Sequence, residues 1–174
     1  ERQGYFSRSK KYKEGLINTI YDMEKKFPKF LEMLNIIIKR FPNEVFYLRP
    51  HPLERIETWH KHFSKFENVK ISKDGNINEQ LVNSKLLIHN SCTSAFHSFL
   101  YKIPTVSYEP VECISDYGEP ANRMSKRVKK VDDLCDLIKE IINNDFKNFN
   151  FEKKNNLFDY KVYRPNHKYS SEII

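Results

Sequence analysis

Glycine is scarce in this sequence, with four residues among 174. None of the four lies near Ser91, where hydroxyl residues follow an apolar run, so a glycine-rich phosphate loop is excluded there. The three cysteines, Cys92, Cys113 and Cys135, have no CxxC spacing and no matching histidine pattern. This argues against a zinc site and against a disulfide framework, and we expect reduced, buried thiols in a cytosolic protein.

Long hydrophobic runs are also missing. No run of about 18 apolar residues occurs, so the sequence predicts no membrane-spanning helix. No cleavable signal is visible, the first residue is Glu1, and the last residues read as the start of a helix without its body. We therefore expect residues 1–174 to form one domain that is a fragment of a longer protein.

Charge is plentiful but not concentrated. The chain has 30 Lys and Arg against 23 Asp and Glu, a formal net charge of +7. The basic residues are scattered over predicted helix faces and are not gathered with aromatic residues in an RNA-binding signature. We predict no nucleic-acid partner, although the positive field favours anionic substrates such as sugar nucleotides and phosphates at a membrane surface.

Apolar spacing alternates between helical and extended patterns. Two helices are expected before residue 42, one with an apolar face from Leu16 to Phe27 and one that begins at Pro28. Further helices are expected over 53–65, 78–83, from 95 and over 131–142, with strands over 45–48, 69–71, 86–88 and 105–108. Such alternation predicts a doubly wound α/β domain with a parallel sheet covered on both faces. Residues 109–127 are predicted to form a long loop, and 143–168 receive no assignment.

Two polar clusters follow predicted strands. Residues 49–54 (RPHPLE) come directly after one strand, and residues 89–94 (HNSCTS) come directly after another and before a helix. Ligands of a doubly wound sheet bind beyond the carboxyl ends of its strands. Hydroxyl residues at a helix start can hold a phosphate together with backbone N–H groups, or they can simply cap the helix. The candidate nucleotide- and phosphate-binding residues are Arg49, His51, Asn90, Ser91, Thr93 and Ser94.

Two glutamates are secondary candidates for ribose or sugar contacts. Glu109 ends a predicted strand, where a carboxylate could accept ribose hydroxyls. Glu54 lies in the first turn of a predicted helix, where an acidic residue is favourable in any case. No Asp-x-Asp metal clamp occurs, so we expect neither a metal site nor a cofactor.

The order RPHPLE (49–54), HNSCTS (89–94) and KIPTVSY (102–108) resembles the surface carbohydrate biosynthesis family. More distantly, it resembles bacterial sialyl- and polysialyltransferases, Kdo transferases and teichoic-acid glycerophosphotransferases. The resemblance covers about residues 4–110, and a weaker similarity covers residues 165–174. It implies the C-terminal, Rossmann-like half of a metal-independent GT-B glycosyltransferase that uses a CMP-linked donor, with Kdo the favoured sugar.

The resemblance also implies site roles and partners. His51, Ser91, Thr93 and Ser94 would contact the cytidine nucleotide and its phosphate, while the catalytic base would come from an N-terminal domain absent here. The acceptor would be a glycan or glycolipid, and the protein would be cytoplasmic or held at the cytoplasmic face of the inner membrane. Ser94 stands where many members have Thr, and His97 stands where a small or acidic residue is commoner. The alternatives are a UDP-sugar epimerase-like enzyme and a non-catalytic α/β interaction module.

Overall fold

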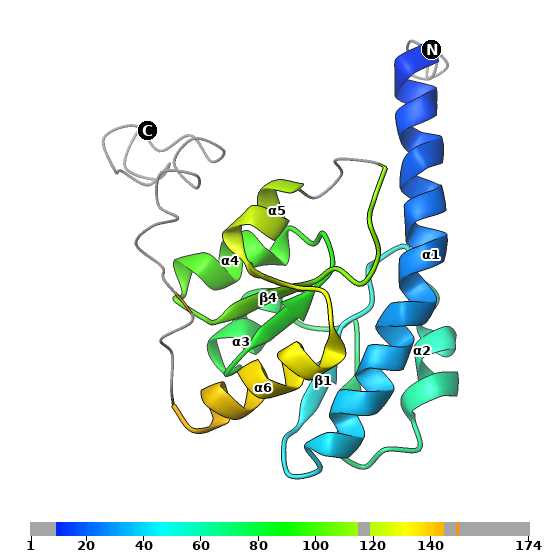
Figure 1. Ribbon diagram of the computed structural model, residues 1–174. Coiled ribbons are helices and arrows are strands. Elements are labelled where there is room, and N and C mark those ends of the chain that lie inside the picture. The colour runs from blue at the N-terminus through cyan, green and yellow to red at the C-terminus, as the bar shows by residue number, and fades with distance from the viewer. Residues whose placement is uncertain (1–9, 115–118, 145–148, 150–174) are drawn as a thin grey trace, which may run out of the picture.

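The computed structural model describes residues 10–114, 119–144 and 149 (Figure 1). Its helices and strands alternate from the first strand onward. The helices are α1 (Lys10–Arg40), α2 (Ile56–Phe63), α3 (Ile77–Val82), α4 (Ser94–Leu100), α5 (Glu119–Met124) and α6 (Val131–Ile142). The strands are β1 (Phe46–Leu48), β2 (Val69–Ile71), β3 (Leu87–His89), β4 (Thr105–Tyr108) and β5 (Lys126–Val128).

The strands form two small parallel sheets flanked by helices. One sheet pairs β1 with β2, and the other has the order β3-β4-β5. In the larger sheet Ile88 lies opposite Val106, and Tyr108 lies opposite Val128. A helix lies between each strand and the next, which gives the chain the crossover that parallel pairing requires. The predicted α/β class with parallel strands is therefore confirmed.

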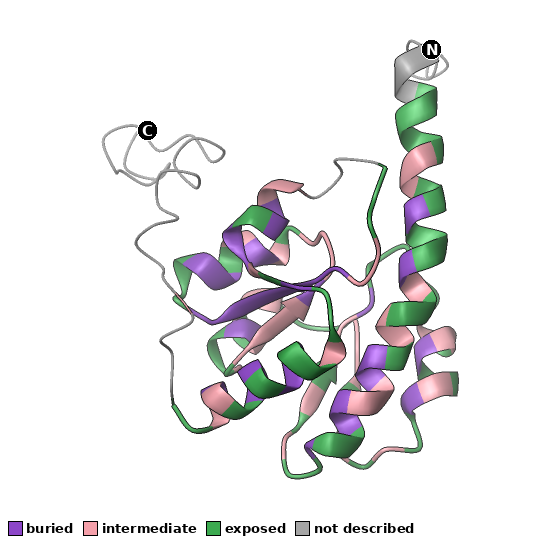
Figure 2. Ribbon diagram, in the orientation of Figure 1, coloured by how far each residue is buried: buried purple, intermediate pink, exposed green. Residues whose placement is uncertain are grey.

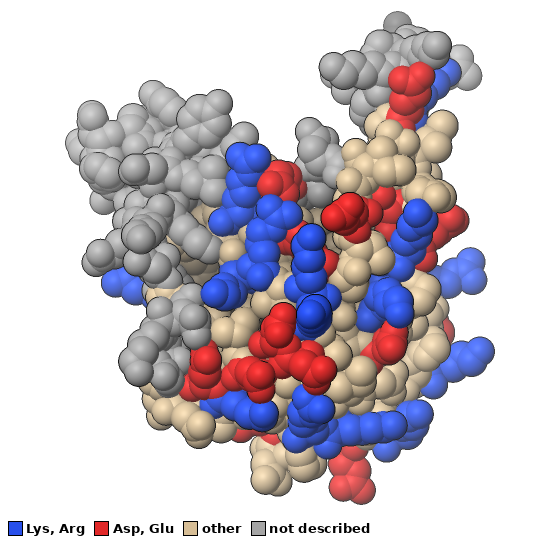
Figure 3. Space-filling view, in the orientation of Figure 1, with Lys and Arg blue, Asp and Glu red and all other residues tan. Residues whose placement is uncertain are grey.

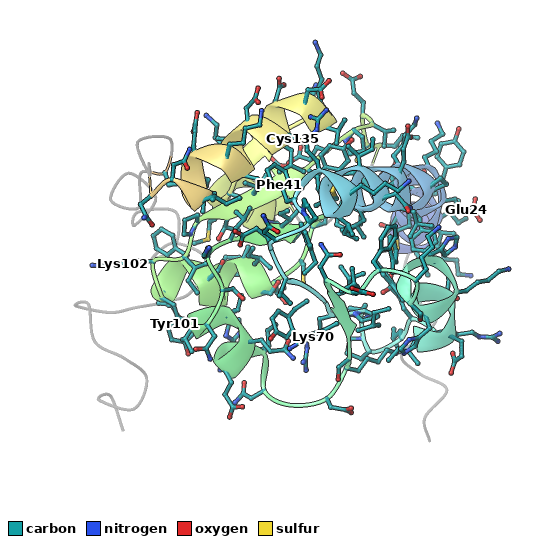
Figure 4. All side chains as sticks on the ribbon, turned by 90° about the horizontal axis from the view of Figure 1, so that it is seen from below. Glu24, Phe41, Lys70, Tyr101, Lys102 and Cys135 are labelled. Atoms are coloured by element: carbon teal, nitrogen blue, oxygen red, sulfur yellow. The ribbon has the colours of Figure 1, made fainter. Side chains whose placement is uncertain are left out.

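Strand β4 is buried on both of its faces. Val106 and Tyr108 belong to a core that also contains Ile37 of α1 and Leu134 of α6. Thr105, which points the other way, bonds to Ser98 of α4 through their hydroxyl oxygens, 2.6 Å apart. Because side chains alternate between the two faces of a strand, β4 packs against helices on both of its sides. Figure 4 shows α6 on one side of the larger sheet, with Cys135 of α6 and Phe41, which follows α1, labelled there.

The two sheets share one hydrophobic core. Leu48 of β1 and Phe63 of α2 lie in the same cluster as Val106 and Val128 of the larger sheet. Phe63 has no exposed surface, and its burial contributes about 2–3 kcal/mol to folding. An ion pair of 3.2 Å between Lys85 and Glu44 also joins the segments that precede β3 and β1. The described segments therefore pack as one body.

The structure corrects the prediction of two helices before residue 42. Helix α1 runs unbroken from Lys10 to Arg40 with Pro28 in its interior. An interior proline removes one backbone hydrogen bond and costs about 3 kcal/mol. Burial of Met33, Leu34 and Ile37 on the following turns offsets that cost, at about 1.5–3 kcal/mol for each side chain.

The predicted long loop over 109–127 is also wrong in its second half, which contains α5 and β5. The β5 sequence Lys-Arg-Val has no apolar run, and it is a strand because its backbone pairs with β4. Helix α2 begins at Ile56 rather than at residue 53, because residues 51–54 form a turn closed by the bond from the Glu54 N–H to the His51 carbonyl. The other elements agree with prediction within one or two residues, and most of 143–168 lies outside the described residues.

Within the described ranges, no helix is both long enough and apolar enough to cross a membrane. Helix α1 has the length, with 31 residues, but lysine and glutamate recur along it, as they do along helices that face water.

Candidate functional site

His51 lies exposed in a tight turn at the carboxyl end of β1. The backbone N–H of Leu53 donates to Nδ1 of His51 at 3.2 Å. The backbone N–H of His51 in turn donates to the Glu54 carboxylate at 2.8 Å. Because Nδ1 is an acceptor, the neutral ring carries its proton on Nε2. The turn therefore presents an N–H donor to solvent, and Glu54 is used to close the turn.

Lys73 and Arg49 hold this turn against the loop that follows β2. The Lys73 ammonium donates to the carbonyl oxygen of Pro52 at 3.1 Å and to that of Glu54. The Arg49 guanidinium donates to the carbonyl oxygens of Asp74 and Gly75, both at 2.8 Å. Arg49 therefore fixes the position of one loop relative to another. Lys73 was missed by sequence reasoning, because only the pairing of β1 with β2 brings it to the turn.

The second cluster is covered by a residue from far along the chain. Ser91 has a φ of 57°, a conformation that non-glycine residues rarely adopt. Its backbone N–H donates to Oδ1 of Asn122 at 3.1 Å, and the same oxygen accepts a 2.9 Å hydrogen bond from the Ser107 hydroxyl. The Asn122 amide group donates back to the Ser91 hydroxyl at 3.3 Å. Asn122, on α5 and 6% exposed, thus holds the chain in this strained turn.

Asn90 and Ser94 also bond within the protein. The Asn90 side-chain amide donates to the carbonyl oxygen of Tyr108 at 2.9 Å, which ties the end of β3 to the end of β4. The Ser94 hydroxyl donates to Sγ of Cys92 at 3.0 Å. Thr93 differs from both, because it is the N-cap of α4 and its exposed side chain forms no capping hydrogen bond. Plain capping therefore does not account for the Thr93 hydroxyl.

His89 is buried beneath this cluster as a neutral imidazole. Its Nδ1 accepts from the Cys92 N–H at 3.2 Å, so Nε2 carries the proton and donates to the Ser125 hydroxyl at 2.6 Å. That hydroxyl donates to the carbonyl oxygen of Ala121 at 2.9 Å. Burial lowers the pKa of His89 to about 4. From the sequence we assigned no role to His89. The one signal available was its place in the period-two alternation of the strand.

Glu109 is occupied by an ion pair. Nε of Arg127 donates to both Glu109 carboxylate oxygens, at 3.0 and 2.9 Å, and Nη2 adds a further bond. The hydrogen bonds that Arg127 donates to the Glu109 carboxylate raise the pKa of the Arg127 guanidinium. Arg127 also reaches Glu119 on α5 at 3.3 Å. The carboxylate predicted to accept ribose hydroxyls therefore serves, in this structure, to hold the end of β4 beside β5.

Helix α3 connects the two clusters. Gln80 accepts a 3.2 Å hydrogen bond from Arg49, and Asn78 bonds at 2.9 Å to His97 on α4, the helix that follows the second cluster. Among the described residues, no hydrogen bond joins residues 49–54 directly to residues 89–94. The convergence of His51 and Thr93 on a common ligand stays a prediction.

A separate surface concavity of about 870 Å³ lies between β5 and α6. Its basic wall includes Arg127 and Lys130, and its acidic wall includes Asp133 and Asp136. Figure 3 shows the acidic side chains gathered over α6 with Lys and Arg on either side. Because the two signs compensate, this surface has no net attraction for an anion, and Glu109 is the one predicted site residue that lines it.

The described residues contain no group of three or more His, Cys, Asp or Glu side chains that could hold a metal ion. Cys92, Cys113 and Cys135 are all free thiols, and Cys135 is the buried one. Comparison of the chain with protein-family models, with curated proteins and with solved structures gives no significant match. The function therefore has to be inferred from the residues at the strand ends.

Proposed function

We propose that this chain is the nucleotide-binding half of a GT-B-type glycosyltransferase, and that it binds a CMP-linked sugar acid for the synthesis of a bacterial surface polysaccharide. The observation that supports this best is the turn at His51. Its hydrogen bonds place an imidazole N–H donor on the surface at a strand end, where parallel α/β proteins bind ligands. Further support comes from Thr93, whose hydroxyl is not used in capping.

In this proposal the two parallel sheets are parts of one doubly wound sheet with the order β2-β1-β3-β4-β5. The shared core supports this order, as does the Lys85–Glu44 ion pair, which brings the amino ends of β3 and β1 together. The order of strands then changes direction between β1 and β3. The crevice at that point lies between the two polar clusters, which is where a nucleotide would bind.

The proposed chemistry is stabilisation of a departing phosphate. Nε2 of His51 would donate to a phosphate oxygen of CMP, and the Thr93 hydroxyl would add a second donor. Neither step uses a metal ion. A second domain would supply the acceptor site, a glycan or glycolipid, together with the catalytic base.

The remaining candidates would act as positioning residues. Arg49 fixes the loop beside the His51 turn, and Glu54 closes that turn. Asn90 and Ser91 set the path of the chain into α4, and Ser94 bonds to the neighbouring Cys92. Because these groups already have partners inside the protein, their substitution should lower nucleotide affinity less directly than substitution of His51.

Isothermal titration of the whole chain with CMP, CDP and UDP tests the proposal. We expect CMP to bind and His51→Ala to weaken that binding more than tenfold, about 1.4 kcal/mol or more, without loss of folding. The matched control is His60→Ala, which removes another exposed imidazole, on α2, bonded at 3.2 Å to Ser64. Binding of UDP alone would refute the cytidine assignment. Absence of binding by all three nucleotides would favour the interaction module instead.

A further inference from the structure

An apolar stripe on α1 continues past the body of the protein, by which we mean the two sheets, helices α2 to α6 and the part of α1 that packs on them. Its members are separated alternately by four and three residues, the spacing of one face of a helix that packs on another helix. They are Leu16, Ile20, Met23, Phe27, Phe30, Leu34 and Ile37, and the same spacing continues to Phe41, one residue beyond the end of α1. The sequence therefore builds a single packing face along almost the whole length of α1.

The two halves of this stripe have different surroundings. Leu34, Ile37 and Phe41 are at most 8% exposed, whereas Leu16 and Ile20 are about half exposed, at 51% and 49%. Figure 1 shows the N-terminal half of α1 extending beyond the sheets, and Figure 2 shows burial along α1 concentrated in its C-terminal half. The five members from Phe27 to Phe41 pack in or against the protein's own core, whereas the other three, Leu16, Ile20 and Met23, are about half exposed.

The projecting half is held in a defined position. Asp22, which is 2% exposed, accepts the backbone N–H of Ile114 with both carboxylate oxygens, at 3.0 and 3.1 Å. This contact ties α1 to the segment that follows β4. It lies on a different side of the helix from Leu16 and Ile20, because positions 20 and 22 are about 200° apart around a helix. The apolar stripe therefore remains accessible above the body.

We propose that this stripe is the interface of a homodimer, in which α1 pairs antiparallel with α1 of a second copy. With the two-fold axis near Asn18, Leu16 of each copy lies opposite Ile20 of the other. The overlap then runs from residue 10 to residue 26, about 25 Å of helix, and it includes the N-terminal part of α1 that extends beyond the sheets. The antiparallel arrangement places the two bodies at opposite ends of the pair.

Charge complementarity favours a second copy as the occupant. Lys13 and Glu24 flank the stripe, are exposed, and form no ion pair with any other described residue. In the antiparallel pair, Lys13 of each copy lies beside Glu24 of the other, which gives two reciprocal contacts of opposite charge. A parallel pair would place like charges together and would bring both bodies to the same end. The antiparallel arrangement is therefore the one that the stripe and its charges support.

A flat lipid surface fits this stripe less well. The stripe faces the same side of α1 as the body, so the body itself would keep a bilayer from reaching Leu16 and Ile20 together. Glu24 also lies beside the stripe, where a helix bound to an anionic membrane would have apolar or basic residues. This proposal is independent of nucleotide binding, since the interface contains neither His51 nor Thr93.

Sedimentation velocity of the whole chain, from low micromolar to hundreds of micromolar, tests the dimer. We expect a monomer–dimer equilibrium that Ile20→Asp abolishes and that Lys13→Glu weakens by about tenfold. The double variant Lys13→Glu/Glu24→Lys should restore the original affinity, because it exchanges the two charges of each contact. Lys61→Glu, an exposed reversal on α2, is the matched control and should change nothing.

Three outcomes would overturn the dimer. The first is a monomer at every concentration, and the second is a dimer that is unaffected by Ile20→Asp. The third is a chain that is monomeric in solution but co-sediments with phosphatidylglycerol vesicles in a manner that depends on Ile20, which would assign the stripe to a membrane surface. Circular dichroism of each variant shows whether it is folded.

Discussion

The two polar clusters are built in opposite ways. The His51 turn is closed by residues within three positions of it, apart from the Lys73 ammonium, and its imidazole is exposed. The turn at Ser91 is held by Asn122, 31 residues away, and rests on the buried imidazole of His89. The first cluster can therefore change its chemistry with little effect on folding, whereas the second is part of the fold. Because of this difference, measurements of ligand binding and of stability can distinguish residues with a binding role from residues with a structural role.

The largest effect is expected for Asn122→Ala. The change leaves the part-buried Ser91 N–H and the fully buried Ser107 hydroxyl without their acceptor, and an unsatisfied buried group costs about 1–3 kcal/mol. We expect the free energy of unfolding, measured by urea titration, to fall by about 3 kcal/mol. Asn83→Ala is the matched control, because it removes an exposed side-chain bond to the Glu79 carbonyl and should cost less than about 1 kcal/mol. Equal losses in the two variants would remove the distinction between the clusters.

His89 should make stability depend on pH. Its pKa is about 4 in the folded protein and about 6.5 when unfolded, so the unfolded chain binds more protons between these values. The contribution is fully present above pH 6.5 and is lost as the pH falls towards 4, by up to about 3 kcal/mol. Urea titrations of the wild type and of His89→Gln across this range should show that the variant has the shallower dependence. Parallel curves would show that His89 is not the group responsible.

The smallest effect on stability is expected for Thr93→Val. A capping threonine typically contributes about 1 kcal/mol, but the Thr93 hydroxyl forms no capping bond, so the loss should stay below about 0.5 kcal/mol. Calorimetric binding of CMP by the same variant should nevertheless be weaker. A stability loss of about 1 kcal/mol with unchanged binding would return Thr93 to the role of a helix cap.

Most of the fold could be predicted from the local pattern of the sequence. Val69–Ile71, Thr105–Tyr108 and Val131–Ile142 were predicted with the bounds that the structure has, because each has the apolar period of its own element. Strand β5 was missed for the opposite reason, since its residues are basic and its pairing with β4 decides its conformation. Helix α1 was divided at Pro28 because the local cost of proline was counted without the burial of Met33 and Leu34 beyond it.

The candidate site could be predicted from the sequence only in part. The positions of His51 and Thr93 after strands followed from the sequence, and the structure finds both side chains exposed there. The engagement of Glu109 by Arg127 and of Ser91 by Asn122 could not be foreseen, because these partners come from the stretch expected to be a loop. A residue's availability to a ligand depends on such partners, and they are distant in sequence.

The sequence by itself determined the α/β class, the parallel strands and the polar residues that follow them, because each depends on neighbours a few positions apart. Tertiary structure alone decided which polar groups are buried and bonded, that His89 is neutral, and that the N-terminal part of the stripe on α1 is exposed. Those properties arise from segments brought together by the shared core. Packing decides which groups are buried and which hydrogen-bond partners they have. It brings together residues that are far apart in the sequence.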